Sequence, residues 1–315
     1  MKREKVHLAK APTGLGYSAP PMEDLDGKVA VITGAGGGFG REFARLAARA
    51  GMRLALTDVQ RDALDAIVNE LRESGVTVID ELIDVADGRQ VAALAERTYA
   101  ELGAVHLLMN NAGVGCGGYL WENSERDWQW VMGVNLMGVA HGIRHFVPRM
   151  LAAESAGGDA GHIVNVASMA GWLAPPLMGI YNVSKHAVVA LTETLYHDLR
   201  LAQSSIGVSL LCPAFVATGI AQSHRNRPAA LAEDEAVASK RMAQAGLEKA
   251  VSSGRVSAAE VAVMTFDAIR ANRFYVFTHP KILPGVEARF TAALAGAAPA
   301  DPYATRPESK PAAAE

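Results

Sequence analysis

Short apolar segments alternate with stretches of helical periodicity along most of this chain. This order is typical of repeated βαβ units, which build a parallel sheet. The segments are apolar at successive positions, as in Val29-Ala30-Val31-Ile32, which indicates strands buried on both faces. We therefore expect an α/β fold with a doubly wound, parallel, seven-stranded sheet and helices on both faces. The predicted strands are Val29–Thr33, Met52–Thr57, Thr77–Ile83, His106–Asn110, His162–Ala167, Gly207–Cys212 and Phe274–Phe277.

The stretches between these strands have the length of crossover helices. They are predicted at Arg41–Ala50, Asp62–Ser74, Gly88–Leu102, Glu125–Leu151, Tyr181–Ala202 and Ser257–Ala271. A long polar segment, about residues 214–255, follows the sixth strand and predicts a lid over a binding site. Residues 1–24 and 296–315 lack periodicity. They are predicted to form an N-terminal tail and a disordered C-terminal tail around a single domain of residues 25–295.

Composition argues against several classes of function. The chain has 315 residues, 50% of them hydrophobic, and a formal net charge of −3. It can bury a large core but has no excess of cations for a nucleic acid or an anionic membrane surface. The two cysteines, Cys116 and Cys212, suit a reducing cytoplasm. No segment is apolar enough for a signal peptide or a membrane span, so we expect a soluble, cytoplasmic protein.

No metal is predicted either. His141 and His145 have the spacing of a zinc-binding pair, but no glutamate stands between them as it does in metalloproteases.

A glycine-rich turn directly follows the first predicted strand and leads into the first helix. Glycines let a backbone turn tightly and approach a pyrophosphate, while the N-terminus of a helix supplies unpaired N–H groups. In this strand–turn–helix context the turn predicts a dinucleotide site in a Rossmann-like fold. The residues expected to hold the cofactor here are Gly34, Gly36, Gly38, Phe39 and Gly40.

Asp58 ends the second predicted strand, about 20 residues beyond the glycine turn. A carboxylate at this place can accept hydrogen bonds from the adenine ribose hydroxyls and would repel a 2′-phosphate. Neither Val59 nor Gln60 is a cation, which favours NAD over NADP, although Arg61 keeps NADP as an alternative.

Tyr181 and Lys185 stand four residues apart at the start of a predicted helix, so they share one face. A free phenol has a pKa of about 10, and a nearby ammonium favours its phenolate form. Tyr and Lys at this spacing are commonplace on exposed helix faces, so only their context can indicate a catalytic role. Ser168 ends the fifth predicted strand thirteen residues earlier, at the sheet edge where ligands bind. Together the three predict proton transfer by Tyr181.

At these positions the sequence resembles the short-chain dehydrogenase/reductase family, over about Leu25 to Phe277. The resemblance rests on several motifs in the correct order. They are Gly34, Gly38 and Gly40 of the turn, the segment Asn110-Asn111-Ala112-Gly113, and Asn135, Ser168, Tyr181 and Lys185.

The resemblance implies a role for each matching residue. It implies that Tyr181 is the general acid/base, that Lys185 lowers its pKa and binds the nicotinamide ribose, and that Ser168 orients the substrate oxygen. Asn135 matches the residue that holds a water in a proton relay through the lysine. Further cofactor contacts are implied at Asp84, Val85, Asn111, Ala112, Gly113, Pro213, Val216 and Thr218. Ala214 replaces a glycine that is frequent in the family after Pro213, so this loop is expected to run differently.

The predicted substrate wall is apolar and includes Trp121, Met169, Trp172, Leu177 and Phe215. An apolar wall favours a hydrophobic or aromatic secondary alcohol or ketone. Arg225 and Arg227 in the lid could meet a carboxylate, but a solvated charged surface is the simpler interpretation.

Two other functions remain open: an NADPH-dependent carbonyl reductase, and a non-catalytic nucleotide sensor or scaffold of the same fold. By analogy to the family, we also expect a homo-oligomer, either a dimer or a tetramer.

Overall fold

The computed structural model describes residues 19–159, 161–232 and 237–303. Its centre is a seven-stranded sheet in which every neighbouring pair of strands is parallel, in the order β3-β2-β1-β4-β5-β6-β7. The doubly wound, Rossmann-like sheet expected from the alternating pattern is thus confirmed. The strands are β1 (Val29–Thr33), β2 (Arg53–Asp58), β3 (Val78–Leu82), β4 (Leu107–Asn110), β5 (His162–Val166), β6 (Gly207–Cys212) and β7 (Tyr275–Phe277).

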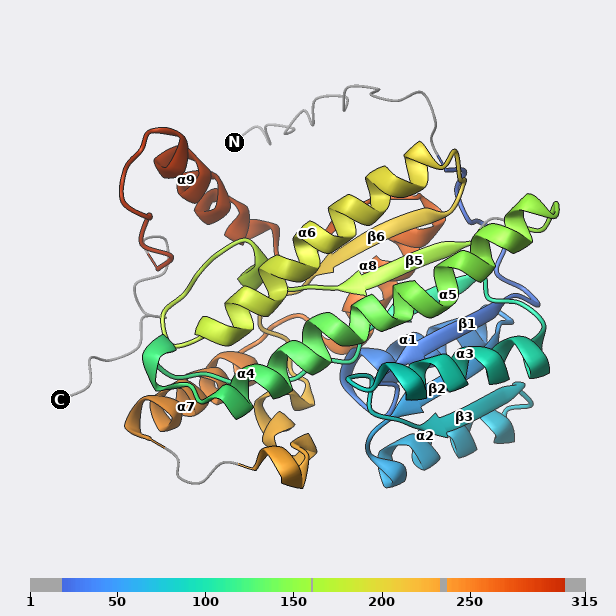
Figure 1. The fold of residues 1–315 in the computed structure, drawn as a ribbon, viewed down its shortest axis with the longest axis horizontal. Coiled ribbons are helices and arrows are strands. Elements are labelled where there is room, and N and C mark those ends of the chain that lie inside the picture. Colours follow the sequence, from blue (N-terminus) through green and yellow to red (C-terminus); the bar gives the residue numbers. More distant parts are fainter. Residues whose placement is uncertain (1–18, 160, 233–236, 304–315) are drawn as a thin grey trace.

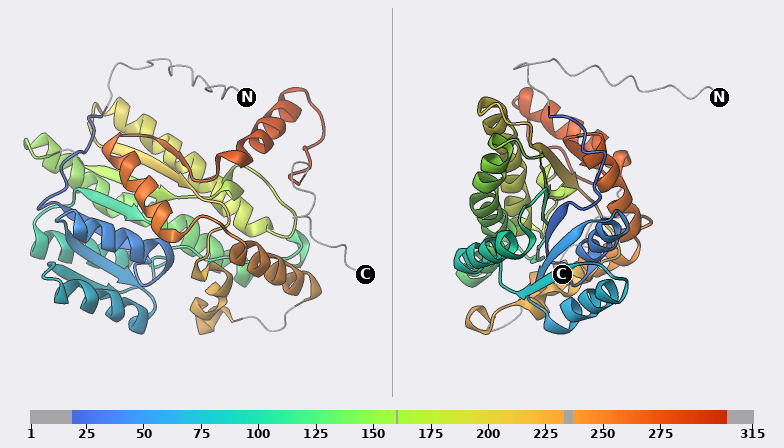
Figure 2. Two further views of the ribbon diagram at one scale, coloured as in Figure 1. Left: turned by 180° about the vertical axis from the view of Figure 1, so that it is seen from behind. Right: turned by 90° about the vertical axis from the view of Figure 1, so that its right-hand side faces the viewer.

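Helices cover both faces of the sheet (Figures 1 and 2). On one face, α3 (Gly88–Leu102), α5 (Gly138–Ser155) and α6 (Gly179–Leu201) pack over β4 and β5. On the other face lie α1 (Gly38–Arg49), α2 (Arg61–Glu73) and α8 (Ala258–Arg270), of which α1 and α8 are seen from behind in Figure 2.

Side chains of β1 alternate between the two faces, as the pleat of a strand requires. Ala30 and Ile32 belong to the core cluster on the α1 and α8 side, whereas Val29 and Val31 belong to the cluster under α3 and α5. All four are fully buried. This two-sided burial explains why the strand segments are continuously apolar.

The region predicted as one helix, Glu125–Leu151, consists of three parts. They are α4 (Glu125–Met132), a π-helical segment (Gly133–Met137) and α5. The π segment is tightly packed: a Cβ added to Gly138, which follows it, would lie 2.7 Å from a methyl carbon of Val85. Single π-helical turns within longer helices are frequent at functional sites.

Two helices were not predicted. The first, α7 (Ala238–Ser252), lies in the segment that was expected to be a polar lid. The second, α9 (Leu283–Leu294), has no buried residue and projects from the body of the protein (Figure 1).

The predicted tails need correction where the structure describes them. Met22 is buried, and it joins a core cluster, so ordered packing begins before residue 25. At the other end, Pro302 and Tyr303 lie against the protein, although 296–315 was predicted to be disordered. Residues 1–18 and 304–315 lie outside the described residues. Among the described helices, none has the length and hydropathy needed to cross a bilayer.

Candidate active site

A cavity of about 1350 Å³ opens at the carboxyl ends of the central strands. The chain reverses its order in the sheet between β1 and β4, and such a reversal leaves a crevice in which ligands bind. Most of the predicted site residues meet in this one cavity. Its lining includes Gly34, Gly36, Gly38, Phe39, Asp58, Asp84, Val85, Asn111, Ala112, Gly113, Ser168, Met169, Leu177, Tyr181, Lys185, Pro213, Phe215, Val216 and Thr218.

The glycine turn has the backbone shape that its sequence predicts. Gly34 and Gly38 have φ values of 66° and 51°, in the left-handed region that favours glycine. A Cβ on Gly40 would lie 2.0 Å from the carbonyl oxygen of Gly34. Gly40 is therefore a packing residue that brings α1 close to β1, and it does not line the cavity.

No side chain caps the N-terminus of α1, where Gly37 is the N-cap residue. The first turn leaves N–H groups without helical partners, and it borders open space: Gly37 and Gly38 line the cavity, and nothing lies within 4 Å of a Cβ added to Gly37. A pyrophosphate fits such a cradle, because its oxygens would accept those hydrogen bonds and the helix dipole would favour its charge.

Asp58 is held against the glycine turn. One carboxylate oxygen accepts a hydrogen bond from the N–H of Gly36 at 2.9 Å, and the other accepts one from the N–H of Gln60 at 3.0 Å. Its negative charge thus borders the cavity at a fixed place. Arg61, the residue that kept NADP as an alternative cofactor, forms ion pairs with Asp65 and Asp80 on the surface of the protein.

Sequence reasoning missed a second cation near Asp58. Arg41, in the first turn of α1, lines the cavity and donates a hydrogen bond to the carbonyl oxygen of Gly36 at 2.7 Å. The only sequence signal for it is its place directly after Gly40.

Asn111 joins the ends of β1 and β4 beneath the cavity. Its side-chain amide donates to the carbonyl oxygens of Thr33 at 2.8 Å and of Gly34 at 3.1 Å. The hydroxyl of Thr33 in turn accepts from the backbone N–H groups of Asn111 and Ala112. These contacts tie the ends of the two strands together beneath the crevice.

Ser168, Tyr181 and Lys185 lie on one wall of the cavity. The hydroxyl of Ser168 accepts from the N–H of Ala170 at 3.1 Å and donates to the carbonyl oxygen of Pro213 at 3.3 Å, so β5 and β6 position it together. The Lys185 ammonium nitrogen lies 5.7 Å from the centre of the Tyr181 ring. That nitrogen also donates to the carbonyl oxygen of Val166 at 2.9 Å, which fixes it behind the phenol.

Burial disfavours the charged forms of both Tyr181 and Lys185. It raises the pKa of Tyr181 above its ordinary value, while the Ser168 hydroxyl acts in the opposite direction. Burial also lowers the pKa of Lys185 to about 8, with the nearby Cys212 acting to raise it. Lys185 is therefore able to exchange a proton close to neutral pH.

Asn135 lies in the π-helical segment and is fully buried behind the cavity wall. Its side-chain oxygen accepts from the N–H of Val114 at 2.8 Å, and its nitrogen donates to the carbonyl oxygen of Val114 and to the Ser184 hydroxyl, both at 3.0 Å. The side chain thus fastens the loop after β4 to α6, one residue from Lys185, and does not line the cavity.

Two of the predicted substrate residues lie elsewhere. Trp121 is 79% exposed and stacks on Tyr119 outside the cavity. Trp172 turns away from it, because its ring packs edge-on against Tyr275 and Phe277 and its Nε1 donates to the sulfur of Cys212.

The apolar end of the cavity is formed by other side chains. Leu177 contributes with a backbone φ of 63°, an uncommon and strained conformation for leucine. Its carbonyl oxygen accepts from the N–H of Gly118 at 2.8 Å, which helps to hold it there. The apolar lining also includes Cys116, Met169, Leu173, Pro175, Met178, Phe215, Ile220, Leu247 and Val251.

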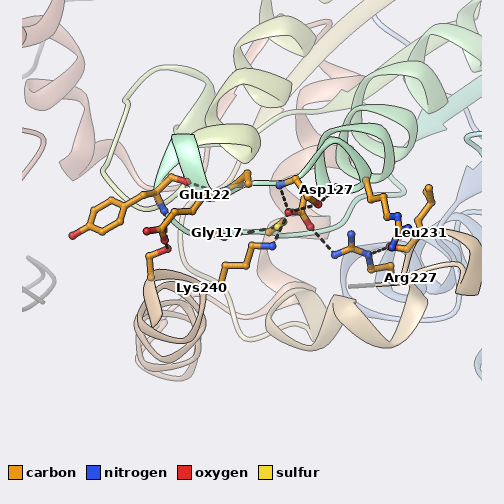
Figure 3. Close-up of polar contacts among 12 residues, drawn as sticks. Gly117, Glu122, Asp127, Arg227, Leu231 and Lys240 are labelled. Atoms are coloured by element: carbon orange, nitrogen blue, oxygen red, sulfur yellow. Dashed lines mark hydrogen bonds and ion pairs between the residues drawn. The ribbon is translucent and has the colours of Figure 1, made fainter. Parts of the chain in front are cut away.

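Segment 214–255 is fastened to the body of the protein at Asp127 of α4, as Figure 3 shows. This carboxylate is fully buried and forms ion pairs with Arg227 and Lys240, each at 2.7 Å. It also caps the start of α4 with Ser124. Burial alone would raise the pKa of Asp127, but the hydrogen bonds from Lys240, Ser124 and Arg227 outweigh it and keep that pKa below its ordinary value. The guanidinium of Arg227 is therefore already paired with the carboxylate of Asp127.

Among residues 19–159, 161–232 and 237–303, no three His, Cys, Asp or Glu side chains are grouped as a metal site. His141 instead bonds through Nδ1 with the carbonyl oxygen of Val85, at 2.9 Å.

A parallel sheet with a glycine cradle at its switch point and a Ser–Tyr–Lys set on the adjoining wall defines a class of dinucleotide-dependent oxidoreductases. The profile described as short chain dehydrogenase matches residues 28–229. The chain belongs to this family.

Relatives and solved structures are similar over most of the chain. A CLA biosynthesis dehydrogenase/reductase of Lactiplantibacillus plantarum is 33% identical and covers 88% of this chain and 97% of its own length. A C alpha-dehydrogenase of Sphingobium sp. is also 33% identical, over 90% of this chain and 92% of its own. A short chain dehydrogenase/reductase from Burkholderia phymatum, solved in complex with NAD, is 55% identical with a TM-score of 0.86, covering 89% of this chain and 99% of that one.

Proposed function

We propose that this protein is an NAD-dependent dehydrogenase that acts on a hydrophobic or aromatic secondary alcohol or the corresponding ketone. The observation that carries the proposal is that Ser168, Tyr181 and Lys185 share a cavity with the glycine turn and Asp58. The NAD complex of the similar Burkholderia phymatum enzyme supports the cofactor. The apolar lining around Leu177 supports the substrate class.

Tyr181 takes the proton of the substrate hydroxyl during oxidation and returns it to the carbonyl oxygen during reduction. Ser168, held by Ala170 and Pro213, orients the same oxygen by hydrogen bonding. Lys185, when protonated, favours the phenolate of Tyr181 and can pass a proton onward. The bound nicotinamide supplies or accepts the hydride.

The direct test is to mix the protein with NAD or NADP and a panel of apolar and aromatic secondary alcohols, and in parallel with NADH or NADPH and the corresponding ketones, and to follow the absorbance of the reduced nicotinamide. We expect oxidation with NAD and faster turnover of the apolar alcohols. Tight NAD binding without turnover across the panel would favour the sensor. Turnover confined to NADPH and ketones would favour the carbonyl reductase.

Cofactor choice is tested separately at Asp58. Asp58→Asn keeps an oxygen that can accept from Gly36 but removes the charge. We expect kcat/KM with NAD to fall by about tenfold or more, because charged hydrogen bonds to the ribose are lost, and kcat/KM with NADP to rise as repulsion is relieved. Asp62→Asn, in the exposed first turn of α2, is the control and should change neither value. An unchanged NAD-to-NADP ratio in Asp58→Asn would remove Asp58 from cofactor selection.

We also propose that the protein acts in the cytoplasm as a homo-oligomer, a dimer or a tetramer, which associates through the face formed by α5 and α6 (Figure 1). Exposed apolar side chains on or beside these helices support this surface. Met137, directly before α5, is 44% exposed, and Val183 on α6 is 42% exposed.

A further inference from the structure

A short segment of the 214–255 region crosses the cavity beside the glycine turn. We call Gly219–Asn226 the strap. Thr218, directly before the strap, is so close to the glycine turn that a Cβ on Gly38 would lie 3.3 Å from the Thr218 Cβ. At its end, the Asn226 side-chain oxygen accepts a hydrogen bond from the side-chain amide of Gln60, just beyond β2. The strap therefore spans the region between the glycine turn and the end of β2.

The strap is anchored at further points. The buried Ser223 hydroxyl accepts from the N–H of Gly115 at 2.8 Å and donates to the carbonyl oxygen of the same residue at 3.1 Å. Arg227, the next residue after the strap, is paired with the fully buried Asp127 (Figure 3). These contacts define where the strap places its side chains.

Arg225 is the cation on this strap, and it lines the cavity. One guanidinium nitrogen would lie 2.9 Å from a Cβ added to Gly219, so the side chain folds back over the start of the strap, beside Thr218. Arg225 is exposed and makes no hydrogen bond or ion pair with another residue in the part of the chain that the structure describes. Arg41 and Arg45, which also line the cavity, are bonded to Gly36 and to Glu42 and Glu70, respectively.

We propose that Arg225 binds the pyrophosphate of the dinucleotide from the strap side, opposite the N-terminus of α1. This inference rests on the proposed function, because it requires a dinucleotide in the cavity. The N–H groups of α1 contact the anion from one side, and the guanidinium, whose planar donors suit phosphate oxygens, contacts it from the other. Arg225 would thereby connect the strap directly to the bound cofactor.

The test compares the binding of ADP-ribose and adenosine by competition against NADH fluorescence. ADP-ribose carries the pyrophosphate, whereas adenosine does not. In Arg225→Gln we expect the dissociation constant of ADP-ribose to rise about tenfold and that of adenosine to stay within about twofold of wild type. Arg255→Gln removes an exposed cation just beyond α7 and outside the cavity, and it should change neither constant.

Equal ADP-ribose affinity in Arg225→Gln and wild type would overturn the proposal. So would an equal loss of affinity for adenosine, because Arg225 would then act on the shape of the site and not on the pyrophosphate. A fall in kcat/KM confined to carboxylate-bearing substrates, with ADP-ribose binding unchanged, would likewise overturn it and assign Arg225 to the substrate. Failure of the wild-type protein to bind both NADH and ADP-ribose would instead overturn the proposed cofactor.

Discussion

Tyr181→Phe will lower kcat by about 10²–10⁴-fold, the usual contribution of a positioned acid or base, and leave NAD affinity within about twofold of wild type. The substitution removes only the hydroxyl that exchanges the proton. The ring, its packing and its distance of 5.7 Å from the Lys185 ammonium can stay as they are. The measurement is steady-state kinetics with the best alcohol of the panel, together with NAD binding by calorimetry.

The matched control is Tyr196→Phe. Tyr196 lies on the same helix, α6, but packs against Phe274 outside the cavity. The Tyr196→Phe variant should keep the wild-type kcat. If Tyr181→Phe retained more than about a tenth of the wild-type kcat, another group would be the acid/base, and the assignment from the Ser–Tyr–Lys pattern would be wrong.

Much of the fold and of the cofactor site could be predicted because their determinants are local in the sequence. The glycine turn, with its left-handed Gly34 and Gly38, sits between an apolar strand and a helix, and that context defines the backbone shape. Asp58 ends β2 and Ser168 follows the end of β5 by two residues, and a parallel sheet brings such ends to one edge. The positions of these residues relative to the predicted strands and helices were therefore sufficient to predict the cofactor site.

Side-chain direction could not be predicted in the same way. Trp172 follows Ser168 by four residues, and closeness in sequence suggested that both face the substrate. Its ring instead packs against Tyr275 and Phe277, which lie about a hundred residues later on β7. An indole buries more surface in an aromatic cluster than at the rim of an open cavity. No local sequence pattern predicts that cluster.

The 214–255 region shows the same limit for charged residues. Arg227 was interpreted as part of a solvated charged surface, since its partner Asp127 lies a hundred positions earlier in the chain. The polar composition of this region also concealed α7. Its attachment is the least predictable part of the site, because its ion pairs join residues that are far apart in the sequence to one buried carboxylate.

Asp127→Ala will loosen this attachment, at a cost of about 3–5 kcal/mol, the usual penalty for removing one partner of a buried ion pair. Two cations, with side chains only 9% and 11% exposed, would lose the carboxylate that neutralises them. We expect faster proteolysis within 219–252, faster amide exchange in α7 and a KM for substrate raised at least tenfold, because the wall formed by Leu247 and Val251 would be displaced.

Two comparisons separate the ion pairs from other effects of the change. Glu125→Gln alters an exposed acid in the first turn of the same helix, and it should leave proteolysis and KM unchanged. Arg227→Met should lower the free energy of unfolding much less in the Asp127→Ala background than in wild type, because the partner of Arg227 is already absent.

Because the pKa of Asp127 is lowered in the folded protein, the stabilisation by these ion pairs is present above about pH 4 and is lost as the pH falls further. If Asp127→Ala left the proteolysis of 219–252 at the wild-type rate, the two ion pairs would not be what holds this segment against the cavity.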